Sequence, residues 1–80
     1  MQLELYYYNA CPFCGIVLRA IEQLGMEEKI VMKNTREHRE YAQELIQMNG
    51  YSQVPCLVID GKPMLESADI NQFLYSHFGS

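Results

Sequence analysis

Residues 3–24 read LELYYYNACPFCGIVLRAIEQL, and this stretch decides the fold. Residues 3–7 follow a strand-like alternation and are rich in aromatic side chains, which is typical of a β-strand. Pro12 then stands where a helix would begin, because proline at the first helical position loses no hydrogen bond and already has a helical φ. Apolar residues recur after it at helical spacing, at Phe13, Ile16, Val17, Ala20, Ile21 and Leu24. Gly25 is a typical helix stop, so the stretch predicts a strand, a short break and an amphipathic helix.

The middle of the chain predicts a second strand and a second helix. Ile30, Val31 and Met32 form a short apolar run that is typical of a strand. Thr35 suits the N-cap of the helix that follows, because its hydroxyl can accept a backbone N–H. Asn49-Gly50 is expected to end that helix.

The last part of the chain predicts a hairpin and a third helix. Residues 56–59, CLVI, form a continuous apolar run that suits a strand buried on both faces. Asp60-Gly61 is a type I′ hairpin dipeptide, so we expect a return strand that begins at Met64. Ser67 can cap a final helix. The predicted order is β-α-β-α-β-β-α, an α/β fold with a four-stranded mixed sheet and helices on both faces.

The composition is that of one small globular domain covering residues 1–80. Hydrophobic residues make up 49% of the chain and charged residues 20%, which excludes a disordered tail. Six scattered basic residues against ten acidic ones give a net charge of −4 and exclude a nucleic-acid partner. No apolar run approaches the roughly 18 residues of a membrane span, so we expect no membrane partner. Met1–Tyr8 has no secretory signal pattern, which predicts a cytoplasmic protein, and polar outer positions on the last helix favour a monomer.

The cysteines indicate the chemistry. Cys11, Cys14 and Cys56 are too few, and odd in number, for a disulfide framework. Cys11 falls at or near the N-cap of the first helix, where unpaired N–H groups and the helix dipole favour its thiolate. The thiolate is the nucleophile in disulfide exchange, and Cys14, one turn further along, lies within disulfide reach. We therefore expect Cys11 to attack and the less exposed Cys14 to resolve.

Two other interpretations of the cysteine pair stay open. A structural zinc site needs four ligands, and the remaining candidates, Cys56, His38 and His77, stand at no recognised spacing, so we expect no metal. Alternatively, both cysteines are small core residues, an interpretation that Pro12 between them disfavours.

A second signal precedes the buried strand at Gln53-Val54-Pro55-Cys56. A proline there marks an edge or the first residue of a strand, and its peptide bond is either trans or cis. Spacing alone does not choose between the two. A cis bond would leave the N–H and C=O of Val54 free to pair with a substrate backbone.

Together these motifs resemble those of the glutaredoxin family. C-P-F-C at residues 11–14 follows the first strand, and V-P at residues 54–55 precedes the third. Residues 49–55, NGYSQVP, and residues 65–70, LESADI, further resemble the N-terminal, glutathione-binding domain of glutathione S-transferases. The chain is therefore similar over essentially its whole length to a glutaredoxin of the transferase-like branch, which implies a thioredoxin-like fold.

The resemblance also implies a glutathione site. Val54 would pair its backbone with the cysteinyl part of glutathione, beside a cis Pro55. Glu66 and Ser67 would hold the γ-glutamyl group, because a carboxylate attracts the ammonium and a helix N-terminus attracts the carboxylate. The remaining implied binding residues are Pro12, Phe13 and Gln53.

Two positions depart from the family pattern. Tyr8 stands where many glutaredoxins carry a basic residue, three positions before the first cysteine. Ser52 replaces the basic residue that often precedes the V-P motif by two positions. The glycyl carboxylate of glutathione then lacks an evident cation, for which Lys33, Arg36 and Arg39 are candidates.

The function expected from these patterns is that of a glutathione-dependent thiol–disulfide oxidoreductase. Glutathione would be its co-substrate, and proteins or small molecules that contain disulfides would be its partners. One alternative is a redox protein reduced by a donor of the thioredoxin-reductase type. Another is a non-catalytic module that binds glutathione.

Overall fold

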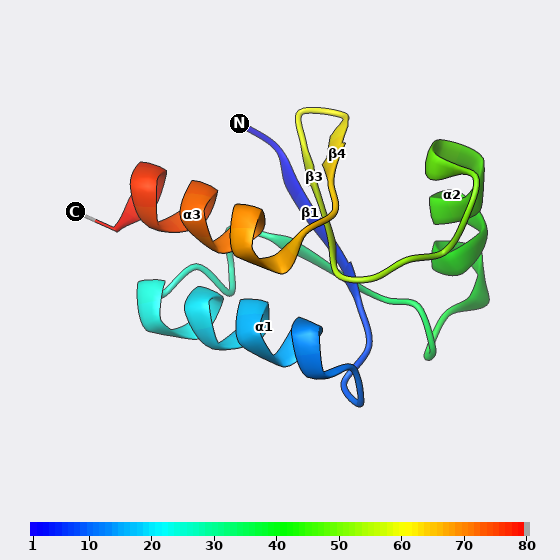
Figure 1. Ribbon diagram of the computed structural model, residues 1–80, viewed down its shortest axis with the longest axis horizontal. Helices are drawn as coiled ribbons and strands as arrows, with labels where there is room; N and C mark the ends of the chain where they lie inside the picture. Colours follow the sequence, from blue (N-terminus) through cyan, green and yellow to red (C-terminus); the bar gives the residue numbers. More distant parts are fainter. Residues whose placement is uncertain (80) are drawn as a thin grey trace.

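The computed structural model describes residues 1–79, and Ser80, the last residue of the expected domain, lies outside the described residues. The order of elements is β-α-β-α-β-β-α, as the sequence predicts (Figure 1). The elements are β1 (Leu3–Tyr7), α1 (Pro12–Leu24), β2 (Val31–Asn34), α2 (Arg39–Asn49), β3 (Cys56–Ile59), β4 (Lys62–Met64) and α3 (Ser67–Phe78).

The four strands form one mixed sheet in the order β2-β1-β3-β4. β1 is parallel to β2 and antiparallel to β3, and β4 is antiparallel to β3. The register sets Tyr7 opposite Asn34 on β2 and Tyr6 opposite Cys56 on β3. The C-terminal ends of β1 and β2 therefore lie at the same end of the sheet as the start of β3, and the loops at these points meet there.

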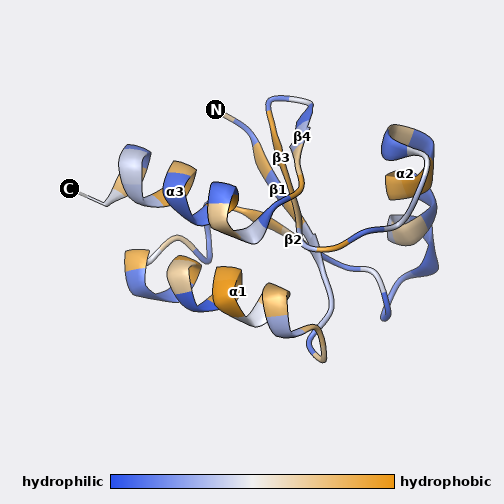
Figure 2. Cartoon of the chain, in the orientation of Figure 1, coloured by the Kyte–Doolittle hydropathy of each residue, from blue (hydrophilic) through white to orange (hydrophobic). Residues whose placement is uncertain are grey.

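Helices cover both faces of the sheet, as predicted. α1 and α3 lie beside each other on one face and α2 lies on the other (Figure 1). The larger core, under α1 and α3, contains Leu3, Leu5, Val17, Ile21, Met26, Ile30, Leu57, Ile70 and Leu74. The smaller core, under α2, contains Tyr6, Leu45, Cys56 and Val58. Figure 2 shows the hydrophobic colouring of β3 and of part of β1. None of the helices described is long and apolar enough to cross a membrane.

The first helix begins and ends where the sequence predicts, but its buried face is rotated. Pro12 is its first residue, and Gly25 caps its C-terminus with a left-handed φ of 66°. The buried residues of α1 are Cys14, Val17, Ala20 and Ile21. Phe13 and Ile16 are 62% and 44% exposed, contrary to the predicted apolar stripe. Because the side chain of Cys14 points inward in the first turn of the helix, the side chains of Phe13 and Ile16 point outward.

Two helix starts also differ from the prediction. Thr35 does not cap α2. The N-cap residue of α2 is His38, and its side chain makes no capping hydrogen bond. The turn at residues 34–37 is instead closed by the side chain of Asn34, whose amide oxygen accepts two backbone N–H groups. Ser67 is the first residue of α3 rather than its cap, and Glu66 occupies the N-cap position.

The hairpin forms at the predicted turn, but its return strand starts earlier than expected. Asp60 and Gly61 have φ values of 49° and 87°, the left-handed values that a type I′ turn requires. This two-residue turn pairs Ile59 directly with Lys62. The strand therefore begins at Lys62 and ends, rather than begins, at Met64.

Candidate functional site

Cys11 is the N-cap residue of α1, as the sequence predicts. Its backbone is extended, and its Sγ accepts a hydrogen bond from the N–H of Cys14 at 3.2 Å. The N–H of Cys11 donates to the carbonyl oxygen of Tyr8 at 3.3 Å, which ties the cysteine to the loop after β1. The sulfur of Cys11 is thereby held at the N-terminal end of α1.

Cys14 lies one turn further along α1 in a different environment. It is fully buried, whereas Cys11 is 6% exposed, so the expected order of exposure is confirmed. Burial, followed by the hydrogen bond with Cys11, raises the pKa of Cys14 to about 12. Cys14 is therefore a thiol at neutral pH. Of the two cysteines, Cys11 is the more exposed one, and its sulfur lies at the N-terminus of the helix.

A pocket of about 300 Å³ opens beside the first turn of α1. Its lining residues are Phe13, Gln53, Val54, Pro55, Leu65, Glu66 and Ser67. The structure thus brings together residues from the start of α1, the loop before β3 and the start of α3. Pro12, the other residue implied by the resemblance, is exposed and does not line the pocket. Leu65 also lines the pocket, although the resemblance carried by residues 65–70 implied binding roles only for Glu66 and Ser67.

The loop before β3 contributes backbone groups to this pocket. The Val54–Pro55 peptide bond is cis, the alternative that the resemblance implied. Within residues 1–79, neither the N–H nor the C=O of Val54 has a hydrogen-bond partner. Because Val54 lines the pocket, these two groups are available to an extended ligand that runs along the loop.

The start of α3 forms the polar wall of the pocket. The N–H of Ile70 is hydrogen-bonded to the carbonyl oxygen of Glu66 at 2.9 Å, so the N–H groups of the preceding turn have no acceptor inside the helix. This end of the helix favours an anion, whereas the exposed carboxylate of Glu66 favours a cation. The pocket therefore suits a small ligand that carries an ammonium and a carboxylate close together.

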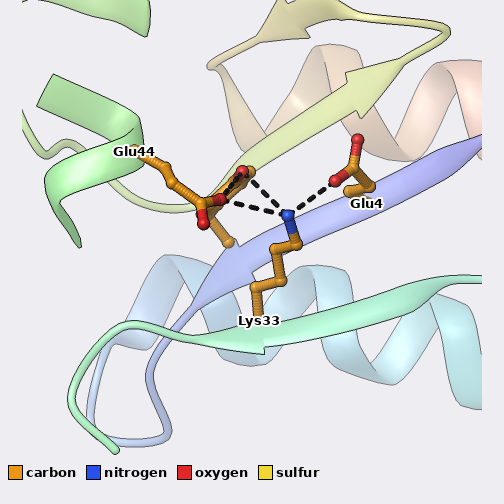
Figure 3. Close-up of polar contacts among 4 residues, drawn as sticks. Glu4, Lys33 and Glu44 are labelled. Carbon is orange, nitrogen blue, oxygen red and sulfur yellow. Dashed lines mark hydrogen bonds and ion pairs between the residues drawn. The ribbon is translucent and has the colours of Figure 1, made fainter. Parts of the chain in front are cut away.

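The three candidate cations of the sequence analysis lie in different surroundings. The Lys33 ammonium is 2.7 Å from a carboxylate oxygen of Glu4 and 3.1 Å from one of Glu44, so both acids engage it (Figure 3). Burial lowers the pKa of Lys33, but its hydrogen bonds with these groups and with Tyr6 raise it above the usual value. The guanidinium of Arg36 lies 3.9 Å from the centre of the Tyr8 ring, and Tyr8 belongs to the loop between β1 and Cys11. Arg39 is the exposed first residue of α2.

The third cysteine lies away from this pair. Cys56 is fully buried in the smaller core, where burial raises its pKa and the side-chain amide of Asn49 contacts its sulfur at 3.8 Å. His38 and His77 are both exposed. Within residues 1–79 no three His, Cys, Asp or Glu side chains gather in the geometry of a metal site.

One sequence family matches almost the whole chain. Its description is glutathione S-transferase, N-terminal domain, and the match covers residues 5–80. No curated protein matches the sequence.

Solved structures match the fold over essentially its full length. A glutathione S-transferase isozyme of Drosophila melanogaster is 29% identical, with a TM-score of 0.75 over 99% of this chain and 36% of the other. A delta-class glutathione transferase of Nilaparvata lugens is 28% identical, with a TM-score of 0.77 over 98% of this chain and 37% of the other. A glutathione transferase Omega of Trametes versicolor is 24% identical, with a TM-score of 0.81 over 100% of this chain and 35% of the other.

These three structures are transferases rather than glutaredoxins. They have the thioredoxin-like fold that the sequence predicts for this chain. The chain spans a little over a third of the length of each of them.

Proposed function

The chain belongs to the family of glutathione S-transferase N-terminal domains, and from this membership we propose that it is a glutathione-dependent thiol–disulfide oxidoreductase. The observation that carries the proposal is the position of Cys11. Its sulfur caps α1 and accepts the N–H of Cys14, and Phe13, two residues later, forms part of the pocket wall. We propose that residues 1–80 perform the reaction as one domain.

Glutathione would bind along the pocket. Its cysteinyl backbone would pair with the unpartnered N–H and C=O of Val54, beside Pro55. Its γ-glutamyl carboxylate would lie at the N-terminus of α3, where Ser67 begins the helix, and its ammonium would face Glu66. The side chains of Phe13 and Gln53 would flank the peptide, with Pro12 outside the pocket.

The reaction would begin at the Cys11 thiolate. The thiolate attacks one sulfur of a substrate disulfide, a new S–S bond forms to Cys11, and the other sulfur leaves as a thiolate that takes a proton from water. When glutathione is the half that stays on Cys11, a second glutathione thiolate attacks its sulfur, which releases oxidised glutathione and restores the Cys11 thiolate. Each mixed disulfide thus consumes one free glutathione, which leaves joined to the glutathione half of the substrate as oxidised glutathione, while the other half leaves as a thiol.

Cys14 would provide a second route. Once Cys11 is in a mixed disulfide, the sulfur of Cys14 can attack Cys11 and expel the bound thiol, leaving a Cys11–Cys14 disulfide. The burial of Cys14 and its raised pKa make this step slow unless a proton acceptor is at hand. Cys14 is therefore expected to assist turnover rather than to be indispensable.

A glutathione-coupled reductase assay tests the proposal. The substrate is a small mixed disulfide, and glutathione reductase with its nicotinamide donor reports the oxidised glutathione formed. Cys11→Ser should abolish turnover, and Cys14→Ser should retain part of it. Cys56→Ser is the matched control, because Cys56 is buried under α2 outside the pair. Activity that survives in Cys11→Ser but not in Cys14→Ser would reverse the two roles.

Absence of turnover in the wild type would contradict the proposal as stated. Calorimetry with S-methylglutathione then separates two outcomes. Binding without turnover would indicate a non-catalytic glutathione-binding module. No binding would direct the search to a donor of the thioredoxin-reductase type, tested by replacing the glutathione system with that reductase.

The proposal also includes a cellular location and an oligomeric state. A cytoplasmic location supplies the reduced glutathione that the reaction consumes. We propose that the protein works as a monomer, and sedimentation equilibrium across a range of concentrations tests this.

A further inference from the structure

A cluster of four polar side chains attaches α2 to the sheet (Figure 3). Its members are Glu4 and Tyr6 on β1, Lys33 on β2 and Glu44 on α2. The Tyr6 hydroxyl donates to Oε1 of Glu44 at 2.6 Å, and the Lys33 ammonium donates to the same Oε1 at 3.1 Å. The ammonium also donates to the Tyr6 hydroxyl oxygen at 3.2 Å. Glu44 is thus held by two donors, one of them charged, and hydrogen bonds between charged groups are the stronger ones.

Apart from this cluster, α2 has few means of attachment. Leu45 is its one buried residue, whereas α1 buries four. Tyr41, which is half-buried, packs edge-to-face against the ring of Tyr6 with the ring centres 6.4 Å apart. The N-cap residue makes no capping side-chain hydrogen bond. Because Glu44 directly precedes Leu45, its two hydrogen bonds hold the helix at the point where the buried leucine enters the core.

The smaller core under α2 continues into the wall of the pocket. Tyr6 and Leu45 belong to this core, and Val54 and Leu65 pack against it. Val54 and Leu65 also line the pocket beside the first turn of α1. Protein interiors are close-packed, so a shift of one core side chain displaces the side chains that touch it. The contacts therefore run without interruption from Glu44, through the smaller core, to the pocket.

The backbone makes the same connection. The last residue of α2 is Asn49, and the N–H of Gly50 donates to the carbonyl oxygen of Ile46 at 2.7 Å. The short loop that follows carries Val54, whose N–H and C=O have no partner within residues 1–79. This loop starts from the end of α2, so a displacement of the helix also displaces the backbone groups that the loop offers to a ligand.

We propose that Glu44 is a positioning residue for glutathione, which holds α2 on the sheet and thereby fixes the pocket wall at Val54 and Leu65. This inference rests on the proposed function, in which glutathione occupies the pocket. Glu44 does not line the pocket, so it acts through the smaller core rather than on the ligand. Coupling between two sites is reciprocal, so glutathione bound at Val54 also strengthens the attachment of α2.

Calorimetry with S-methylglutathione tests the forward direction of this coupling. Glu44→Ala removes both hydrogen bonds of the carboxylate, and Tyr6→Phe removes only the hydroxyl while keeping the ring in the smaller core. Each should weaken binding by about two- to tenfold, the range of a single hydrogen bond. Glu44→Gln keeps an acceptor for both donors and should retain more of the affinity. The matched controls are Gln43→Ala, at an exposed position of α2, and Tyr7→Phe, whose ring packs against the larger core.

Three further readouts separate positioning from a general loss of structure. In Glu44→Ala the KM for the glutathione mixed disulfide should rise while kcat changes little. The rate at which iodoacetamide alkylates Cys11 should stay unchanged, because Cys11 begins α1 and lies outside the smaller core. In the wild type, S-methylglutathione should slow hydrogen exchange of the amides of residues 43–46, which do not line the pocket. This protection should disappear in Glu44→Ala.

The inference is overturned if Glu44→Ala and Tyr6→Phe bind S-methylglutathione as tightly as the wild type, or if the controls weaken binding equally. It is also overturned if the ligand leaves exchange at residues 43–46 unchanged. If Glu44→Ala does not fold, Tyr6→Phe and Glu44→Gln decide the question. Binding without turnover in the wild type would contradict the proposed function alone, and the comparison of affinities would still decide the role of Glu44. No binding by the wild type would overturn both.

Discussion

Replacement of Asn34 by alanine should destabilise the protein by about 3 kcal/mol. Asn34 is the polar residue that the structure buries within residues 1–79, and its amide makes three hydrogen bonds of 2.9–3.1 Å. Each such bond contributes roughly 1 kcal/mol, and a partner left without one in a buried site loses its solvation as well. Alanine removes all three bonds, so their contributions are lost together.

Urea denaturation and thermal melting measure this effect. For a domain of 60–100 residues, each kcal/mol shifts the melting temperature by about 4–8 °C, so Asn34→Ala should melt about 12–24 °C lower. Asn34→Asp keeps the acceptor for the two backbone N–H groups and loses only the donor to Asn9, so it should cost about 1 kcal/mol. Asn9→Ala, which removes one exposed partner, should cost no more than that.

The graded order of these variants is the critical result. If Asn34→Ala costs less than about 1 kcal/mol, the turn at residues 34–37 does not depend on the buried amide. If Asn34→Asp is as damaging as Asn34→Ala, the bond to Asn9 rather than the closed turn carries the effect. Either result would show that the turn at residues 34–37 is not held by the two backbone N–H bonds to Asn34 Oδ1.

Three further predictions concern single groups. The hydrogen bond from Tyr6, followed by that from the Lys33 ammonium, lowers the pKa of Glu44 in the folded protein. The ionised Glu44 carboxylate therefore stabilises the fold fully above the ordinary carboxyl pKa, and this stabilisation is lost as the pH falls through the lowered pKa. The melting temperature of Glu44→Gln, measured between about pH 6 and 3, should therefore depend less on pH than that of the wild type. In Cys11→Ser, the burial that raises the pKa of Cys14 should keep its reaction with iodoacetamide slow at pH 8, and a rate equal to that of free cysteine would contradict this. Gly15→Ala should stabilise α1 by up to about 1 kcal/mol in urea denaturation, because within residues 1–79 no atom outside its own turn of the helix and its chain neighbours lies within 4 Å of the added methyl group. A destabilised variant would contradict this. A stable variant with reduced turnover would show that the glycine keeps access to Cys11 open.

Several features of the site could be predicted because they depend on residues close in sequence. A proline directly after Cys11 sets the start of α1, and the N-cap position of the cysteine follows within one turn. The left-handed residues Asp60 and Gly61 set the hairpin in the same local way. The glutathione-related residues around Val54 and Glu66 were identified by resemblance, and the structure places them in one pocket.

Other features could not be predicted because residues far apart in sequence decide them. Periodicity included Phe13 in the buried stripe, but the packing of α1 turns Cys14 inward and leaves Phe13 in the pocket wall. Thr35 suits a cap by residue type, but Asn34 closes the turn with its Oδ1 and also reaches Asn9, a contact between residues 25 positions apart.

The resemblance to the glutaredoxin family implied the thioredoxin-like fold. The sequence by itself determined the order of the elements and the location of the cysteine pair at a helix start. These depend on periodicity and on backbone preferences, which act over a few residues. Only the tertiary structure decided that Arg36 lies over the Tyr8 ring. Arg36 reaches the Tyr8 ring because β1 and β2 are parallel neighbours and end together, and no local pattern contains the pairing of two strands.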